Sequence, residues 1–251
     1  MAGHSKWANI KRQKARVDAV RGKTFTQLAR AIIVAARNGI PDPNGNFQLR
    51  TAIEKAKAAG IPNDNIDRAI AKGSGNMDSG AQLEEIRYEG YGMGGVAIIV
   101  EALTDNRHRT AAELRLAFSK RGGNLGEMGC VGWMFDQKGV CSIVGIVEED
   151  ILLEAALAGG ADIYEFIDDE DHPGAEVFTT VTNLEELNAA LTKSGLVVSD
   201  AEIRWIPQNT ILVTDAEQSK QLIKLIEVLE ALDDVQAVTA NFDLAEELLA
   251  N

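Results

Sequence analysis

The chain has 251 residues, and its 38 Asp and Glu outnumber its 25 Lys and Arg, which gives a formal net charge of −13. A hydrophobic content of 45% is enough to build packed cores, and the length suggests about two domains. Residues 1–20 are basic rather than apolar, and no apolar run approaches about 18 residues. We therefore expect neither a signal peptide nor a membrane span, and a cytoplasmic location.

The charge is divided unequally along the chain. Residues 1–75 hold 14 Lys or Arg against 5 Asp or Glu, a net charge of +9, whereas residues 76–251 hold 11 against 33, a net charge of −22. Nucleic acid would repel the molecule as a whole. Only an orientation that presents the first 75 residues could bind it.

The first 23 residues form a basic arm with seven cations and one acid, Asp18. Such a block on an anionic protein is typical of an arm that binds a polyanion. A helix over residues 7–21 would mix its cations with Ile10 and Val17, so we expect the arm to be mobile when free and to order on a partner. The alternative is an ordinary solvated helix face. The expected nucleic-acid contacts in the arm are Lys6, Trp7, Lys11, Arg12, Lys14, Arg16, Arg21 and Lys23.

Three helices are predicted after the arm. Apolar residues at helical spacing predict helices over about 24–38 and from about 49 to Gly60, separated by a Pro-Gly turn at 41–45. Pro62 opens a third helix, which Gly73 closes. The stretch 73–80 is rich in Gly and Ser and predicts a flexible linker. We therefore predict a basic N-terminal helical domain over residues 1–75.

Strands and helices alternate in the remainder of the chain. The first part predicts strands near 83–89, 96–100 and 131–135 with a helix over 107–120. A second series predicts a βαββαβ order, the ferredoxin-like split unit, in strands 139–145, 161–167, 175–181 and 201–206 with helices 148–158 and 183–193. A final helix after Pro207 and a strand over 235–242 could complete the earlier part. The predicted fold class is multidomain α+β, with a discontinuous α+β domain over 81–137 and 208–245 and an inserted ferredoxin-like domain over 138–207.

Two glycine-rich stretches resemble phosphate-binding loops but lack the required context. Gly90, Gly92 and Gly95 fit a dinucleotide-binding spacing, yet a β-type run follows them instead of a helix, which favours a hairpin with positive φ angles. The run 122–126 lacks the Gly-Lys-Ser/Thr ending of a P-loop and is interpreted as a turn that enters a strand. Neither stretch predicts a nucleotide cofactor.

The segment 104–110 has two interpretations. Thr104 and Asp105 are good N-caps for the helix that follows. Arg107, His108 and Arg109 would form a basic island in an acidic domain, so we also expect a secondary RNA or phosphate contact through Arg107 and Arg109.

No metal, cofactor or small-molecule substrate is predicted. Cys130 and Cys141 lie outside any Cys-x-x-Cys spacing and are expected to be buried thiols, and the three histidines show no ligand spacing. The acidic run 168–172 is interpreted as a solvated loop rather than a metal site. No catalytic motif stands out, so an enzyme is not expected.

Several motifs closely resemble the YebC/PmpR family, over nearly the whole chain. They are AGHSKWANIK at residues 2–11, GKTFT at 22–26, YEGYG at 88–92 and TDNR at 104–107. Small departures at Met93 and Cys130 lie outside the basic arm. The family includes bacterial proteins labelled transcriptional regulators and a mitochondrial translational activator of a cytochrome oxidase subunit. The resemblance implies the same inserted arrangement and a DNA-binding transcriptional regulator.

Two functions remain open at this point. The leading interpretation is a non-enzymatic regulator of gene expression that binds nucleic acid, as DNA, through the basic arm. The alternative is a translation factor that contacts RNA or the ribosome, with its acidic part facing basic ribosomal proteins. The predicted helix 24–38 is mostly Ala and Ile, which is unlike the polar recognition helix of a helix-turn-helix protein. RNA recognised by its shape and phosphates needs no such helix.

Overall fold

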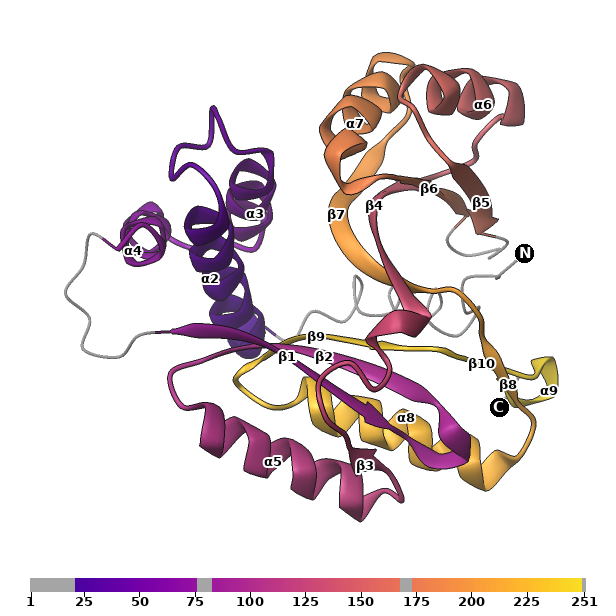
Figure 1. Cartoon of the computed structure of the whole chain (residues 1–251). Helices are drawn as coiled ribbons and strands as arrows, with labels where there is room; N and C mark the ends of the chain where they lie inside the picture. Colours follow the sequence, from indigo (N-terminus) through magenta and orange to yellow (C-terminus); the bar gives the residue numbers. More distant parts are fainter. Residues whose placement is uncertain (1–20, 76–82, 168–172, 250–251) are drawn as a thin grey trace. The chain divides into compact units, whose positions relative to one another are not determined.

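The structure is a computed structural model that describes residues 21–75, 83–167 and 173–249 (Figure 1). The chain divides into two compact units. Unit 1 comprises residues Met1–Met134 and Pro207–Asn251, and unit 2 comprises Phe135–Ile206. The α+β fold class expected from the sequence is confirmed, because unit 1 combines helices with an antiparallel sheet and unit 2 has the βαββαβ order.

Three helices form the first part of unit 1: α2 (Arg21–Asn38), α3 (Phe47–Ala58) and α4 (Asn63–Gly73). Their apolar faces share one core, in which Ile32, Leu49 and Ala56 are fully buried. The helix predicted to start at Thr24 begins three residues earlier, at Arg21. The expected mobility and partner-dependent ordering of the arm concern residues 1–20, which lie outside the described residues.

A four-stranded antiparallel sheet forms the second part of unit 1. Its strands are β1 (Glu84–Tyr91), β2 (Ala97–Thr104), β3 (Asn124–Leu125) and β9 (Val235–Ala240), in the order β3-β1-β2-β9. The helices α5 (Arg107–Lys120) and α8 (Ala216–Glu230) pack against one face of it (Figure 1). Strands β8 (Ile211–Val213) and β10 (Phe242–Leu244) form a separate parallel pair, and a short helix α9 (Glu246–Leu249) ends the described chain.

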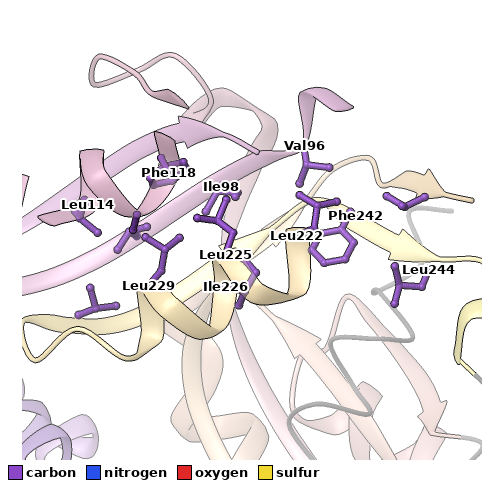
Figure 2. Packing of buried hydrophobic residues seen from close by; sticks show 14 residues of the cluster. Val96, Ile98, Leu114, Phe118, Leu222, Leu225, Ile226, Leu229, Phe242 and Leu244 are labelled. Atoms are coloured by element: carbon purple, nitrogen blue, oxygen red, sulfur yellow. The ribbon is translucent and has the colours of Figure 1, made fainter. Parts of the chain in front are cut away.

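The main core of unit 1 lies between this sheet and its two helices. Figure 2 shows Ile98 of β2, Phe118 of α5 and Leu225 of α8 pointing toward one another, and all three are fully buried. Because side chains alternate along a strand, Leu103 of β2 points away from this core and belongs to the core of the three-helix bundle instead. One strand therefore serves two cores.

The hairpin expected from the glycines near residue 90 is present, because β1 and β2 pair as neighbours. The expected positive φ is found at Gly95 (78°) and also at Gly94 (74°), but not at Gly90 or Gly92. These two glycines are needed for close packing instead. A Cβ at Gly92 would lie 2.7 Å from a methyl group of Leu222, and one at Gly90 would lie 2.7 Å from a backbone oxygen.

The predicted strand over 131–135 is wrong. Residues Gly132–Met134 form a 3-10 turn, and the strand β4 begins only at Phe135. The buried carboxylate of Glu89 accepts hydrogen bonds from the backbone N–H groups of Val131 (2.9 Å) and Gly132 (2.7 Å). These donors bind a side chain instead of a neighbouring strand, so no sheet ladder forms there.

Unit 2 has the topology that the sequence predicted. It comprises β4 (Phe135–Val144), α6 (Glu149–Ala158), β5 (Ile163–Ile167), β6 (Gly174–Thr179), α7 (Leu184–Lys193) and β7 (Val198–Pro207). The sheet order is β5-β6-β4-β7, that of a ferredoxin-like fold, and both helices cover one face (Figure 1). Leu152 of α6 and Leu187 of α7 are fully buried.

Candidate nucleic-acid interface

Most of the predicted arm contacts lie outside the described residues. These are Lys6, Trp7, Lys11, Arg12, Lys14 and Arg16. The backbones of Arg21 and Lys23 form the first turn of α2. Their part in nucleic-acid binding stays a prediction.

Several other cations of the helical bundle have structural contacts. Arg50 stacks over the ring of Phe47 at 5.4 Å and donates a hydrogen bond to the carbonyl of Pro43 at 3.0 Å. Arg37 donates to the carbonyl of Leu83. Lys57 and Arg68 are solvent-exposed. The bundle therefore uses some of its positive charge for its own packing and presents some of it to solvent.

The segment 104–110 builds the start of α5, although with a different cap from the one predicted. Asn106, rather than Thr104 or Asp105, is the N-cap, and its side-chain oxygen accepts a hydrogen bond from the backbone N–H of Arg109 at 3.1 Å. The hydroxyl of Thr104 accepts one from the backbone N–H of Asn106 at 2.9 Å.

The same segment converges on Asp234, which precedes β9 and is almost fully buried. Its Oδ2 accepts hydrogen bonds from the hydroxyls of Thr104 (3.0 Å) and Thr110 (2.7 Å) and from the guanidinium of Arg109 (2.8 Å). Its Oδ1 accepts one from Arg30 of α2 at 3.3 Å. One carboxylate thus connects α2, the end of β2 and α5.

These contacts stabilise the charged form of Asp234. Burial alone would raise the pKa of this carboxyl, but the hydrogen bonds from Arg109, Thr110 and Thr104 outweigh it and leave the pKa below its usual range. In turn, the hydrogen bonds to Asp234 and Asp105 raise the pKa of Arg109. Sequence reasoning missed Asp234, because nothing next to it in the chain marks it as a partner of residues 104–110.

Of the three residues of the predicted basic island, this network ion-pairs Arg109, whereas the side chains of Arg107 and His108 are exposed. Arg109, 45% exposed at its side chain, forms ion pairs with Asp234 and with Asp105 at 2.9 Å. Arg107 and His108 are exposed, and the carbonyl of Arg107 accepts a hydrogen bond from the hydroxyl of Tyr88 at 3.1 Å. Arg109 therefore has a structural role beside any contact with phosphate. The nucleic-acid roles of Arg107 and Arg109 stay predictions.

A second buried carboxylate, Glu89, shapes the loop that precedes unit 2. Burial would raise its pKa, but the hydrogen bonds from the backbone of Val131, Gly132 and Gly129 and the charge of Arg87 leave the pKa lowered. The carbonyl of Cys130 in this loop accepts hydrogen bonds from Tyr91 (2.9 Å) and from the indole of Trp133 (3.2 Å), whose side chain is exposed.

The two cysteines are free thiols. Cys141 is fully buried as expected, and burial raises its pKa to about 12, so it stays protonated near neutral pH. Cys130 is only half-buried, so the expectation of a buried thiol is wrong for it; burial and the nearby charge of Glu89 raise its pKa. Neither thiol is activated as a nucleophile.

Over the described ranges, no three His, Cys, Asp or Glu side chains are grouped so that they could hold a metal ion. In the same parts of the chain, no helix has the length and apolar content to cross a membrane. The acidic run 168–172, interpreted above as a solvated loop, lies outside the residues that the structure describes.

The two units differ sharply in charge. Unit 2 carries 16 Asp or Glu against 3 Lys or Arg, so its net charge of −13 equals that of the whole chain. Unit 1 carries 22 of each kind and is neutral overall. Within unit 1, the positive charge is concentrated in residues 1–75, at +9.

Comparison with known proteins shows similarity along the whole chain. Residues 5–76 match the family described as the TACO1/YebC protein N-terminal domain, and residues 83–242 match the TACO1/YebC second and third domain. A probable transcriptional regulatory protein of Gloeothece citriformis is 71% identical over 251 residues, covering 100% of this chain and 98% of the relative. One of Microcystis aeruginosa is 70% identical, covering 99% and 98%.

A solved structure has the same fold. The crystal structure of a conserved hypothetical protein from Aquifex aeolicus is 47% identical in sequence and superposes with a TM-score of 0.83. The match covers 94% of this chain and 95% of that one.

Proposed function

The chain belongs to the TACO1/YebC family, and from this premise we propose that it is a non-enzymatic regulator of gene expression that binds nucleic acid through its basic N-terminal region. The names of the relatives, probable transcriptional regulatory proteins, favour DNA as the target and transcription as the regulated process. The proposed contacts are the cations of the arm, with Trp7, and secondarily Arg107 and Arg109.

The observation that carries this proposal is the distribution of charge. Residues 1–75 have a net charge of +9 in a chain of −13. Phosphate contacts provide most of the affinity of non-specific nucleic-acid binding. A concentrated cationic region on an otherwise neutral or acidic molecule is the arrangement that such binding requires.

The geometry of α2 supports contact with phosphates rather than reading of bases by this helix. Its Ile32, Ile33 and Ala36 are buried in the core of the bundle, so they cannot reach a groove. Base edges are read by polar side chains on an exposed helix face. Its cations Arg30 and Arg37 donate hydrogen bonds within unit 1, to Asp234 and to the carbonyl of Leu83. The cations of the arm suit a contact that depends on charge and shape.

The proposal is tested first by removing charge from the arm. Changing Lys11, Arg12, Lys14 and Arg16 together to Ala should weaken binding to duplex DNA in a gel-shift titration, with little change in the thermal unfolding temperature. As a control, Lys57→Ala and Arg68→Ala remove exposed cations of the bundle outside the arm. Unchanged affinity in the quadruple variant would contradict the role of the arm.

The dependence on salt tests whether phosphates are the target. If about five cations of the arm each contact a phosphate, the slope of log affinity against log salt should be roughly −4.5 on duplex DNA, or −3.5 on single strands. Deleting residues 1–23 should flatten this slope. A slope that survives the deletion would place the site elsewhere, with Arg107 and Arg109 or the helices of residues 24–73 as the next candidates.

The same protein should be tested in parallel on DNA and on ribosomes. A gel shift with competitor DNA and a ribosome sedimentation assay, both at physiological salt, separate a transcriptional regulator from a translation factor. Retention on DNA alone supports the proposal. Sedimentation with ribosomes without DNA retention would favour the translation factor.

A further inference from the structure

Three chain segments of unit 2 meet at one end of its sheet. The backbone N–H of Val144, at the end of β4, donates to the carbonyl of Val197, next to β7, at 3.1 Å. The N–H of Gly145 donates to the carbonyl of Pro173, next to β6, at 2.9 Å. These bonds fix the backbone at this end of the sheet.

Apolar side chains are exposed at this place. Ile146 is 93% exposed, Val197 is 62% exposed and Val144 is 41% exposed. We call these three residues the apolar tip. Single exposed apolar residues are normal on protein surfaces, but neighbouring ones from two segments form a patch. Ile146 loses almost no surface to the fold, so its side chain adds little to the stability of the unit.

The surroundings of the apolar tip are mainly anionic, although one exposed cation, Lys193 at the end of α7, lies four residues before Val197. Glu148, Glu149 and Asp150 follow it directly in the chain and are exposed. Two of the three cations of unit 2 are engaged in ion pairs, Lys138 with Asp162 at 2.7 Å and Arg204 with Glu176 at 2.8 Å. The unit as a whole carries a net charge of −13, so its long-range field favours the approach of cationic partners.

The combination of an apolar patch and a strong negative charge favours one class of partner over the others. Nucleic acid and anionic membranes would be repelled, and so would the same face of a second copy. Protein interfaces join apolar contacts at their centre to complementary charges at their rim. We propose that the apolar tip is a docking site for a basic protein segment that presents apolar side chains between lysines or arginines.

The patch is small, so the contact belongs to the weak, transient class of interfaces. Its affinity comes from burial of the tip, and its charge complementarity speeds association and makes it sensitive to salt. The site is separate from the proposed nucleic-acid contacts, which lie in unit 1. The protein would thus hold nucleic acid and a basic protein through different units.

The test uses the full chain and a synthetic amphipathic peptide of Leu and Lys, with binding measured by calorimetry. Changing Ile146 and Val197 together to Ser removes apolar surface without changing the charge, and should weaken peptide binding by about tenfold or more. Leu157→Ser is the matched control. Leu157 is 69% exposed and lies near the C-terminal end of α6, outside the tip, so its loss should change affinity by no more than about twofold.

Two further measurements complete the test. A peptide with Ser in place of Leu should bind the wild-type chain about tenfold more weakly, and the Ile146/Val197 variant should retain the wild-type affinity for DNA. Equal binding of the Leu and Ser peptides, or equal binding by the wild-type chain and the double variant, would overturn the proposal. Sedimentation that shows self-association lost in the double variant would also overturn it, because a second copy would then be the occupant.

Discussion

At the scale of single residues, the side chain of Asp234 connects three elements of unit 1. Its carboxylate accepts hydrogen bonds from side chains of α2, of α5 and of the end of β2, and its own backbone carbonyl accepts one from the N–H of Leu103 at 2.8 Å. A buried carboxylate with several donors is hard to replace, because each donor would lose its partner at once.

Asp234→Asn should lower the free energy of unfolding by about 2–4 kcal/mol at neutral pH, because the amide keeps the shape but not the charge that pairs with Arg109 and Arg30. Chemical denaturation with urea measures this change. The neighbouring Asp233 is exposed, and only its backbone carbonyl accepts from Arg30, so Asp233→Asn is a matched control expected to be nearly neutral. Equal effects of the two substitutions would contradict the structural role of Asp234.

The effect of Asp234→Asn should also depend on pH. The folded-state pKa of Asp234 lies below its ordinary value, so the folded chain holds this proton less tightly than the unfolded chain. The charge-dependent stabilisation is therefore fully present above about pH 5, beyond the unfolded-state pKa of about 3.9, and is lost as the pH falls through the folded-state pKa. The difference in unfolding free energy between wild type and variant should accordingly shrink below about pH 4. A difference that stays constant between pH 7 and pH 3 would contradict the charge-based explanation.

For single residues, the sequence predicted that residues 104–110 begin a helix, but it did not predict what their side chains contact. The segment 104–110 was expected to start a helix, and it does. Its partner Asp234 lies 124 residues after Thr110, and local patterns carry no information on contacts over such a separation. The cap was assigned to Thr104 and Asp105 because all of these polar residues suit that position, and only the backbone conformation selects Asn106.

At the scale of elements, the packing of α4 on α2 depends on one glycine. As expected, Gly73 closes the helix, because it is the last residue of α4; it is also buried. A Cβ there would lie 2.5 Å from the carbonyl oxygen of Ile33 and 2.8 Å from the Cβ of Ala36. The two helices can approach this closely only because the side chain is missing.

Gly73→Ala should therefore lower the free energy of unfolding by about 1–3 kcal/mol, since α4 must move away from α2. Helix propensity alone predicts the opposite sign, because Ala is favoured over Gly by about 1 kcal/mol in a helix. Thermal unfolding followed by circular dichroism distinguishes the two. Gly45→Ala is the control, since a Cβ there meets only ordinary contacts at 3.5 Å. Stabilisation by Gly73→Ala would contradict this explanation, because the gain in helix propensity would then exceed the cost of the close contact between α4 and α2.

The helices and most strands could be predicted from periodicity, because each buries one face and therefore repeats apolar residues at its own spacing. The strand predicted over 131–135 failed for a physical reason. Val131 and Phe135 are both buried, as in a strand, but Glu89, 42 residues before Val131, binds the backbone between them. The short strands β3 and β8 have too few residues to show any period.

At the scale of the whole molecule, unit 2 enters and leaves unit 1 at one place. The backbone N–H of Gln208 donates to the carbonyl of Met134 at 2.9 Å, so the two crossings of the chain lie side by side. This explains how a complete ferredoxin-like unit can be inserted into the sequence of unit 1 without disturbing the sheet of unit 1. The sequence predicted the insertion from the order of its elements, and the boundary between the bundle and the sheet of unit 1 remains a prediction.

Replacing residues 135–206 by a short Gly-Gly linker should leave unit 1 folded, because its ends already meet. The shortened chain loses a net charge of −13 and becomes neutral. Its affinity for DNA should therefore equal or exceed that of the full chain at low salt, and the two affinities should converge at high salt. Gel-shift titrations at two salt concentrations test this. A folded, shortened chain that binds DNA more weakly would show that unit 2 contributes to binding.

The pairing of β2 with β9 has a consequence for biosynthesis. Ile98 pairs with Ala240, so the sheet of unit 1 stays incomplete until nearly the whole polypeptide has been made. At roughly 5–20 residues per second, the apolar strand β2 waits about 7–28 s for its partner, while unit 2 emerges and can fold as a unit. During this interval Ile98 and Phe118 lack the helix α8 that packs against them in the folded protein. The nascent chain therefore exposes apolar surface that is prone to aggregation and that chaperones protect.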